Sequence, residues 1–108
     1  MKWEQLSEFV ETWAASHGLP ADMGGRTLTL VEFANEADCG FFYPDRDLVS
    51  QKAFTMALSK FARARKARTE HVTIHPEQYR AWLAAEKLED APEHRERFIE
   101  SRYRLLPT

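Results

Sequence analysis

A helical pattern dominates the middle of the chain. Between Asp47 and about Arg68, apolar residues recur at the spacing of one helix face. These residues are Phe54, Ala57, Leu58, Phe61 and Ala62. The pattern predicts an amphipathic helix that begins after Asp45 and Asp47, which can cap it, and that decays near Ala64. We expect the other segments to pack against this central helix.

Two further amphipathic helices are predicted on either side of it. The first covers Lys2 to Ser16 and ends at His17-Gly18, where a helix should stop. Its apolar stripe consists of Trp3, Leu6, Phe9, Val10 and Trp13. We expect both tryptophans to be deeply buried, because large aromatic surfaces dominate core energetics. The second helix opens at Pro76 and carries Tyr79, Trp82 and Leu83 on one side.

The last helix is predicted from Pro92 to about Leu105. Asp90 with Glu93 three residues later forms a variant of the capping box at its start. Its apolar stripe consists of Phe98, Ile99, Tyr103 and Leu106. Between the central helix and Pro76, the segment Thr69 to His75 alternates polar and apolar residues and is rich in β-branched ones. This pattern predicts a strand.

The segment from Arg26 to Tyr43 has two interpretations. We favour a short helix from about Thr29 to Asp38, with Thr27 or Thr29 as its cap and Gly40 as its exit. The alternative is a hairpin in which 27–33 pairs with 39–43. In either case we expect at least two of the three rings in 41–43 to lie in the core.

These elements predict the fold class. We expect a mainly α, α+β protein, a single compact domain over residues 1–108 with four to five helices and a small β element that contains Val72 and Ile74. The single cysteine, Cys39, cannot form an internal disulfide, and the first residues lack a secretory pattern. No apolar run approaches the ~18 residues of a membrane span. We therefore expect a cytoplasmic protein with no membrane partner.

The charges are distributed in blocks that the net charge of −2 conceals. Residues 1–49 carry a net −6, residues 50–69 a net +6 and residues 70–108 a net −2. The positive block contains no acidic residue. Such a basic island can bind phosphates, or it can pair with the protein's own acidic surface.

The basic island supplies the candidate nucleic-acid-binding residues. These are Lys52, Lys60, Arg63, Arg65, Lys66 and Arg68. Ser50, Gln51, Thr55 and Ser59 could add contacts to phosphates or bases, with Gln51, Lys52 and Thr55 nearest the bases. The segment VSQKAFTMALSKFARARK resembles the recognition portion of winged-helix modules in phage and plasmid replication proteins, over less than a fifth of the chain. That resemblance implies a possible winged-helix-like fold and DNA binding, and we assign no family from it.

Other chemistry is poorly supported by the sequence. His71 and His75 have a zinc-binding spacing on a helix, but on the predicted strand they would lie about 13 Å apart. Cys39 lacks a nucleophile signature, so a small buried thiol is the better interpretation. We expect no catalytic residues, no metal and no cofactor, and hence no enzyme.

The sequence thus favours a non-enzymatic protein-binding adaptor or regulatory module with an unidentified protein partner. The alternative is a winged-helix-like nucleic-acid-binding module that uses the basic helix around residues 50–68. An exposed apolar patch would favour the adaptor. The candidates for that patch are Phe41, Phe42, Trp82 and Tyr103. The oligomeric state stays open.

Overall fold

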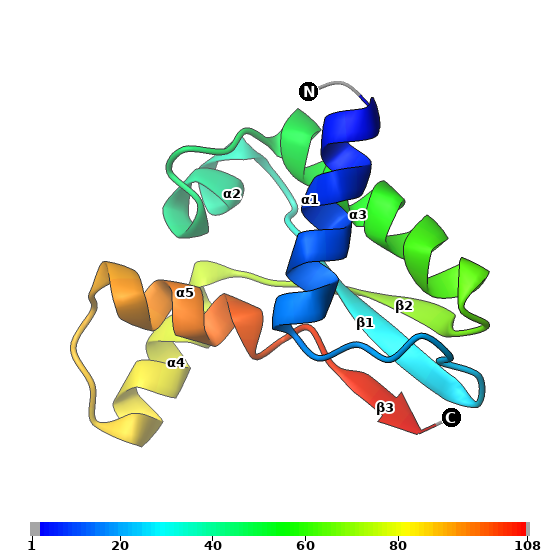
Figure 1. Ribbon diagram of the computed structural model, residues 1–108. Coiled ribbons are helices and arrows are strands. Elements are labelled where there is room, and N and C mark those ends of the chain that lie inside the picture. Colours follow the sequence, from blue (N-terminus) through cyan, green and yellow to red (C-terminus); the bar gives the residue numbers. More distant parts are fainter. Residues whose placement is uncertain (1–2, 108) are drawn as a thin grey trace.

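A central strand, β1 (Arg26–Glu32), organises the fold. The structure is a computed structural model that describes residues 3–107, and it shows five helices and a three-stranded sheet in that range (Figure 1). The other elements in chain order are α1 (Trp3–Ser16), α2 (Glu36–Phe42), α3 (Leu48–Ala64), β2 (Arg68–Thr73), α4 (Pro76–Glu86), α5 (Pro92–Glu100) and β3 (Leu105–Pro107). The predicted α+β class is confirmed.

The sheet has the order β2-β1-β3. The strand β2 runs parallel to β1, with Val31 opposite Val72, and β3 runs antiparallel to β1, with Thr27 opposite Leu106. Parallel neighbours need a crossover connection, which α2 and α3 provide here. Because β1 is paired along both edges, it lies in the middle of the sheet, and β2 forms one edge of the sheet.

The segment 26–43 is where the sequence-based prediction is wrong. Residues expected to start a helix at Thr29 instead form β1, and the helix α2 begins later, with Asn35 as its cap. Gly40 lies inside α2 and does not end it. The alternative hairpin is also wrong, because 27–32 is a strand but 39–42 is helical. The physical reason is that residues 28–31 are all buried, so β1 lacks the polar–apolar alternation that identifies a half-exposed strand.

Four predicted elements are confirmed with small shifts of their ends. These are α1, α3, β2 and α4. Asp47 caps α3 by accepting a hydrogen bond from the Ser50 N–H at 2.7 Å. The helix α1 is followed by Gly18 at φ +67°, a left-handed conformation that suits a glycine at a helix end. The expected positions of the Lys2 and Trp3 side chains lie outside the described part of the chain.

The C-terminal helix is shorter than predicted. The helix α5 ends at Glu100, and residues 105–107 join the sheet as β3. Tyr103 is buried as expected, but Leu106 is 45% exposed. Ala91 is the N-cap residue, and the Asp90 carboxylate does not cap the helix but accepts hydrogen bonds from Arg95. Pairing with the distant strand β1 therefore replaces the last predicted turns.

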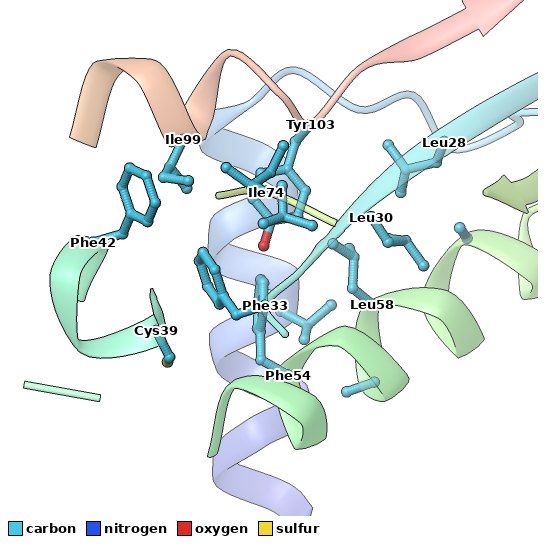
Figure 2. Close-up of a cluster of buried hydrophobic side chains, with 14 of the residues drawn as sticks. Leu28, Leu30, Phe33, Cys39, Phe42, Phe54, Leu58, Ile74, Ile99 and Tyr103 are labelled. Atoms are coloured by element: carbon cyan, nitrogen blue, oxygen red, sulfur yellow. The ribbon is translucent and has the colours of Figure 1, made fainter. Parts of the chain in front are cut away.

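The core lies between β1 and the helices around it. Figure 2 shows Leu28, Leu30 and Leu58 where β1 meets α3, with Phe42 and Ile99 at the other end of the cluster. Leu30 and Leu58 are fully buried. Trp13 and Trp82 are only partly buried against this core, so the expected deep burial of Trp13 is wrong. Of the three rings in 41–43, one is buried and two pack partly against the core.

The order of elements after α3 differs from that of a winged helix. In a winged helix, the strands that follow the recognition helix form an antiparallel hairpin, the wing. Here α3 is followed by β2, which pairs in parallel with β1, and α4 comes next. Within residues 3–107, no hairpin follows α3.

Candidate binding groove between α3 and the sheet edge

A groove of about 680 Å³ runs between α3 and β2. Its walls come from both elements, and the end of β1 with the two residues after it closes one side. The lining residues are Glu32, Phe33, Ala34, Leu48, Gln51, Lys52, Thr55, Met56, Ser59, Lys60, Arg63, His71 and Thr73.

The wall on the α3 side combines basic and apolar side chains. Lys52, Met56, Lys60 and Arg63 follow one another at intervals of four or three residues, so they project from one face of the helix. Met56 is 62% exposed and stands between two lysines. Val49, two turns before Met56, is 74% exposed. The free face of α3 is therefore cationic with exposed apolar positions.

The opposite wall is the strand β2. The side chains of His71 and Thr73 line the groove, and His71 Nδ1 pairs with the Glu32 carboxylate on the neighbouring strand. The one carboxylate of the lining thus lies against a histidine ring. Three cations of α3 also line the groove, and one of them, Arg63, donates to the Thr69 hydroxyl of β2 at 3.5 Å.

The outer edge of β2 has unpaired backbone groups. The N–H of Ile74, just after β2, donates to the carbonyl of Glu32 at 2.9 Å. Successive N–H and C=O groups of a strand point alternately to its two edges. The backbone groups of Thr69, His71 and Thr73 therefore point away from β1. In the described chain, no strand pairs with that edge.

The floor of the groove holds three polar residues that the sequence suggested as ligand contacts. Gln51, Thr55 and Ser59 are all buried. Gln51 donates to the Tyr103 hydroxyl at 3.2 Å, and Thr55 Oγ1 donates to the Val31 carbonyl at 3.2 Å. The expectation that Gln51 and Thr55 face bases is wrong, because these side chains fasten α3 to the core and to β1.

The six predicted cationic residues divide into three groups. Lys52, Lys60 and Arg63 line the groove together. Arg65 instead lies over the Phe61 ring, 3.5 Å from its centroid, beside a smaller hollow next to α1. Lys66 and Arg68 belong to the turn into β2, where Lys66 has φ +74°. The structure thus gathers half of the predicted set.

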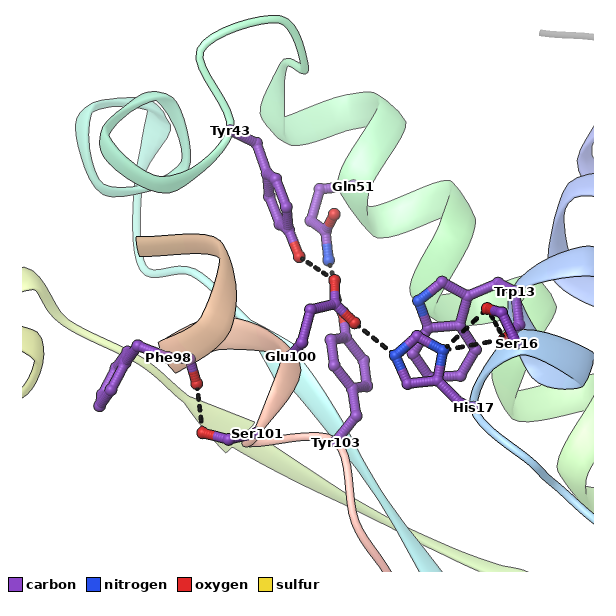
Figure 3. Close-up of polar contacts among 9 residues, drawn as sticks. All are labelled: Trp13, Ser16, His17, Tyr43, Gln51, Phe98, Glu100, Ser101 and Tyr103. Atoms are coloured by element: carbon purple, nitrogen blue, oxygen red, sulfur yellow. Dashed lines mark hydrogen bonds and ion pairs between the residues drawn. The ribbon is translucent and has the colours of Figure 1, made fainter. Parts of the chain in front are cut away.

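A polar cluster away from the groove joins α1, α5 and the loop before α3 (Figure 3). Glu100 Oε2 lies 2.6 Å from His17 Nε2, and Glu100 Oε1 accepts a hydrogen bond from the Tyr43 hydroxyl at 3.4 Å. Burial, with nearby Tyr103 and Glu100, raises the pKa of Tyr43 far above its usual range. The cluster therefore holds a neutral tyrosine and a histidine on one carboxylate.

The serine beside His17 makes this cluster resemble a catalytic triad, but its hydrogen bonds do not fit one. Ser16 Oγ donates to the Trp13 carbonyl at 2.8 Å, and His17 Nδ1 lies 2.9 Å from the same carbonyl. A carbonyl only accepts, so Nδ1 must carry a hydrogen and cannot take a proton from Ser16. The cluster instead ties the end of α1 to α5.

A second hollow of about 460 Å³ lies near that cluster. Its lining includes Phe9, Trp13 and Phe41, and its two arginines are already engaged. Arg46 donates to Gln51 and lies over the Tyr43 ring, while Arg95 donates twice to Asp90 and once to the Phe41 carbonyl. This hollow offers rings, but its cations are held by the protein itself.

The candidate apolar patch named from the sequence is wrong. Phe42 and Tyr103 are buried, and Phe41 and Trp82 are partly buried against the core. The large apolar side chains that the described structure exposes are Phe9, Val49, Met56 and Leu106. Two of these lie on the free face of α3.

The residues considered for metal binding and nucleophilic chemistry have other roles. His71 pairs with Glu32, whereas His75 Nδ1 lies 3.2 Å from Asp38 Oδ2. No cluster of three or more metal-ligating side chains occurs among the described residues. Cys39 is buried as expected, and burial raises the pKa of its thiol.

No protein-family model, curated protein or solved structure matches the chain. None of the helices in residues 3–107 combines the length and the apolar character that crossing a membrane requires.

Proposed function

We propose that this protein is a small non-enzymatic binding module, an adaptor or regulator, that holds a segment of a partner protein in the groove between α3 and β2. The observation that carries the proposal is the groove itself, which places exposed Met56 beside an unpaired strand edge. Peptide-binding domains commonly add an extended segment to such an edge and take its side chains into adjacent pockets.

The energetics of α3 support this proposal. Met56 and Val49 expose most of their side chains on a helix whose other face is fully packed. Covering such a side chain contributes about 1.5–3 kcal/mol relative to leaving it in water. Met56 lines the groove and Val49 does not, so a segment held in the groove would gain this contribution at Met56, which offsets part of the cost of ordering a peptide.

Nucleic-acid binding is the second candidate, and one observation favours it. Lys52, Lys60 and Arg63 stand in a row on one exposed helix face, where they could contact consecutive phosphates. With Gln51 and Thr55 buried, such binding would be to the backbone and would carry little base readout. The apolar Met56 in the middle of this row fits a protein better than a phosphate chain.

The test is site-specific photocrosslinking in an extract of the source cells. A photoreactive residue at Met56 should give a defined protein adduct, and the same residue at Ala85, on the exposed side of α4, should not. Thr73→Trp, which fills the groove from β2, should abolish the adduct. Equal adducts from both positions, or none from Met56, would overturn the proposal.

The nucleic-acid candidate has its own test. Fluorescence anisotropy of labelled single-stranded and duplex oligonucleotides should be measured at ~50 and ~200 mM salt, with a Lys60→Glu/Arg63→Glu variant as control. Steeply salt-dependent binding that the variant loses would favour phosphate contacts. No binding at low salt would remove this candidate.

A further inference from the structure

We propose that the segment held in the groove is the carboxyl-terminal end of the partner protein, laid along β2 as an extended strand, with its terminal carboxylate on Lys52. This inference rests on the proposed function and names the part of the partner that the groove holds. It depends on the direction of α3 along β2, on the wall that ends the groove and on the charges of the groove.

Two hydrogen bonds show how α3 runs along β2. Thr55 Oγ1 donates to the carbonyl of Val31 at 3.2 Å, and Val31 lies opposite Val72 in the sheet. Eight residues later on the helix, Arg63 Nη2 donates to Thr69 Oγ1 at 3.5 Å, near the start of β2. The helix α3 is therefore antiparallel to β2.

This direction places Lys52 at the carboxyl end of β2. Lys52 precedes Thr55 by three residues, which is about 4.5 Å of helix rise beyond the contact with β1. Residues of a strand are about 3.3 Å apart, so Lys52 is nearly level with Thr73, the last residue of β2. Both residues line the groove.

Lys52 is also the charge of the lining that the protein leaves unused. The Glu32 carboxylate lies against His71, Arg63 donates to β2, and Lys60 has a partner within the protein. Lys52 is exposed and makes no hydrogen bond or ion pair with the residues that the structure describes. One anionic group on the partner, at the Lys52 end, therefore completes the charges of the groove.

The first turn of α2 closes the groove at that end. On the helix side, the Glu36 carboxylate accepts a hydrogen bond from the Leu48 N–H at 3.2 Å. On the sheet side, Asp38 Oδ2 lies 3.2 Å from His75 Nδ1, just after β2. Pro76, which has no N–H, then begins α4. An extended segment that follows the edge of β2 therefore has to begin or end here.

Lys52 decides between these two directions. A segment that began here would bring a positively charged α-amino group beside the lysine, whereas a segment that ends here brings a carboxylate. Complementary charge across an interface favours the second arrangement. Capture of a terminal carboxylate and addition of a strand to a sheet edge are both established modes of peptide recognition. The bound strand would run parallel to β2, as β1 does.

The side chains around Lys52 give the chemistry of the last residue. Leu48 and Met56 lie one turn before and one turn after Lys52, and both line the groove. Phe33 lines it as well, next to the closed end. The last residue of the partner should therefore be aliphatic or aromatic, with its side chain against Leu48 and Met56.

The experiment is a selection from two random decapeptide libraries, with the full chain as bait. One library ends in a free carboxylate, and in the other a Gly-Ser tail follows the random segment. Wild-type protein should enrich only the first library, with an apolar last residue. Lys52→Gln should lose this enrichment, whereas Lys87→Gln, the same change outside the groove, should select like wild type. Both variants should melt like wild type.

Synthetic versions of the enriched peptides test the contact with Lys52. Amidation of the terminal carboxylate should weaken binding to wild type about fivefold, the upper value for an exposed ion pair, and should have almost no effect on binding to Lys52→Gln. This coupling assigns the carboxylate to Lys52. Equal binding of the acid and the amide to wild type would overturn the inference.

The same peptides test the strand. Methylation of the alternate peptide nitrogens that face β2 should weaken binding about tenfold, and methylation of the other set should not. Amide shifts in NMR spectra of the protein should change at Thr69, His71 and Thr73. Insensitivity to both methylated sets would overturn the strand model.

The remaining outcomes separate this inference from the proposed function. Enrichment of the tailed library to the same extent, or of neither library, overturns capture of a carboxyl terminus. If the Met56 photocrosslink still gives a defined protein adduct, the groove binds another part of a partner and the proposed function stands. If the photocrosslink fails as well, both proposals fall.

Discussion

Replacing Leu58 by alanine tests the premise that α3 has one packed face and one free face. Leu58 is fully buried between α3 and β1, whereas Met56, two residues earlier, is 62% exposed in the groove. The pair differs in burial but belongs to the same helix turn. Met56→Ala is therefore a matched control for Leu58→Ala.

The expected magnitudes follow from burial. Deleting a fully buried leucine side chain costs the lost transfer free energy and leaves a cavity, together about 3 kcal/mol within a usual range of about 2–5. For a chain near this length, about 4 °C of melting temperature corresponds to each kcal/mol, so Leu58→Ala should melt about 12 °C lower. Met56→Ala should change the free energy of unfolding by less than about 0.5 kcal/mol.

Urea unfolding followed by far-ultraviolet circular dichroism and by tryptophan fluorescence gives both free energies. Coincident transitions would show that the two probes report one cooperative unit. A Met56→Ala cost equal to that of Leu58→Ala would refute the reasoning, because Met56 would then be part of the core and the groove would be closed in solution. A Leu58→Ala cost below about 1 kcal/mol would refute the packing of α3 on β1.

Three further predictions address other parts of the protein. Asn35→Ala removes the side chain that accepts the Asp38 N–H at 2.8 Å, and it should lower the free energy of unfolding by about 1 kcal/mol; an unchanged urea midpoint would contradict this cap. Hydrogen bonds from Arg95, and then from Tyr79, lower the pKa of Asp90. The Asp90 carboxylate therefore stabilises the fold fully above the usual pKa of an unfolded Asp, and this stabilisation is lost as the pH falls through the lowered pKa. The difference in free energy of unfolding between wild type and Asp90→Asn should shrink in acid, and a difference that stays constant with pH would exclude the linkage. Burial raises the pKa of Cys39, so the native thiol should react with a disulfide reagent at pH 8 only in urea, and rapid native labelling would contradict its burial.

Elements that depend on local patterns were predictable from the sequence. The helix α3 has an apolar face at helical spacing and Asp47 as its cap, and both features act within a few residues of each other. Pro76, at the first position of α4, marks the start of this helix after β2, and it does so through its own backbone conformation. Such signals need no knowledge of the rest of the fold.

The strand β1 was not predictable in the same way. Its residues 28–31 are buried on both faces, and a short apolar run of that kind fits a buried strand and a buried helix equally well. These residues form a strand because they pair with β2, about 40 residues later, and with β3 near the end of the chain. The same long-range pairing converts 105–107 from the predicted end of a helix into a strand.

In the candidate site, too, the local features were predictable from the sequence and the features that depend on distant segments were not. The sequence identified the basic residues of α3, but not the partner wall that turns three of them into the lining of a groove. Nor could it show that Gln51 and Thr55, which share the polar side of the helix, are used inside the protein. A polar side chain on a helix face can bind a ligand or fasten the helix to a neighbouring strand. Which of these roles it has depends on the segment that packs beside it, and the sequence does not show that segment.

The groove and the central strand have one structural origin. Because β1 pairs in parallel with β2, the chain must cross over the sheet between them, and α3 makes most of that crossing. The helix buries Leu58 over β1, so its opposite face overhangs β2 and leaves room beside it. A pairing in which β2 lay in the middle of the sheet would cover the edge that we propose the partner uses. A variant that destabilises the β1–β2 pairing should therefore lose partner binding and stability together, whereas Lys52→Glu, at an exposed position of the groove, should weaken partner binding and leave the free energy of unfolding nearly unchanged.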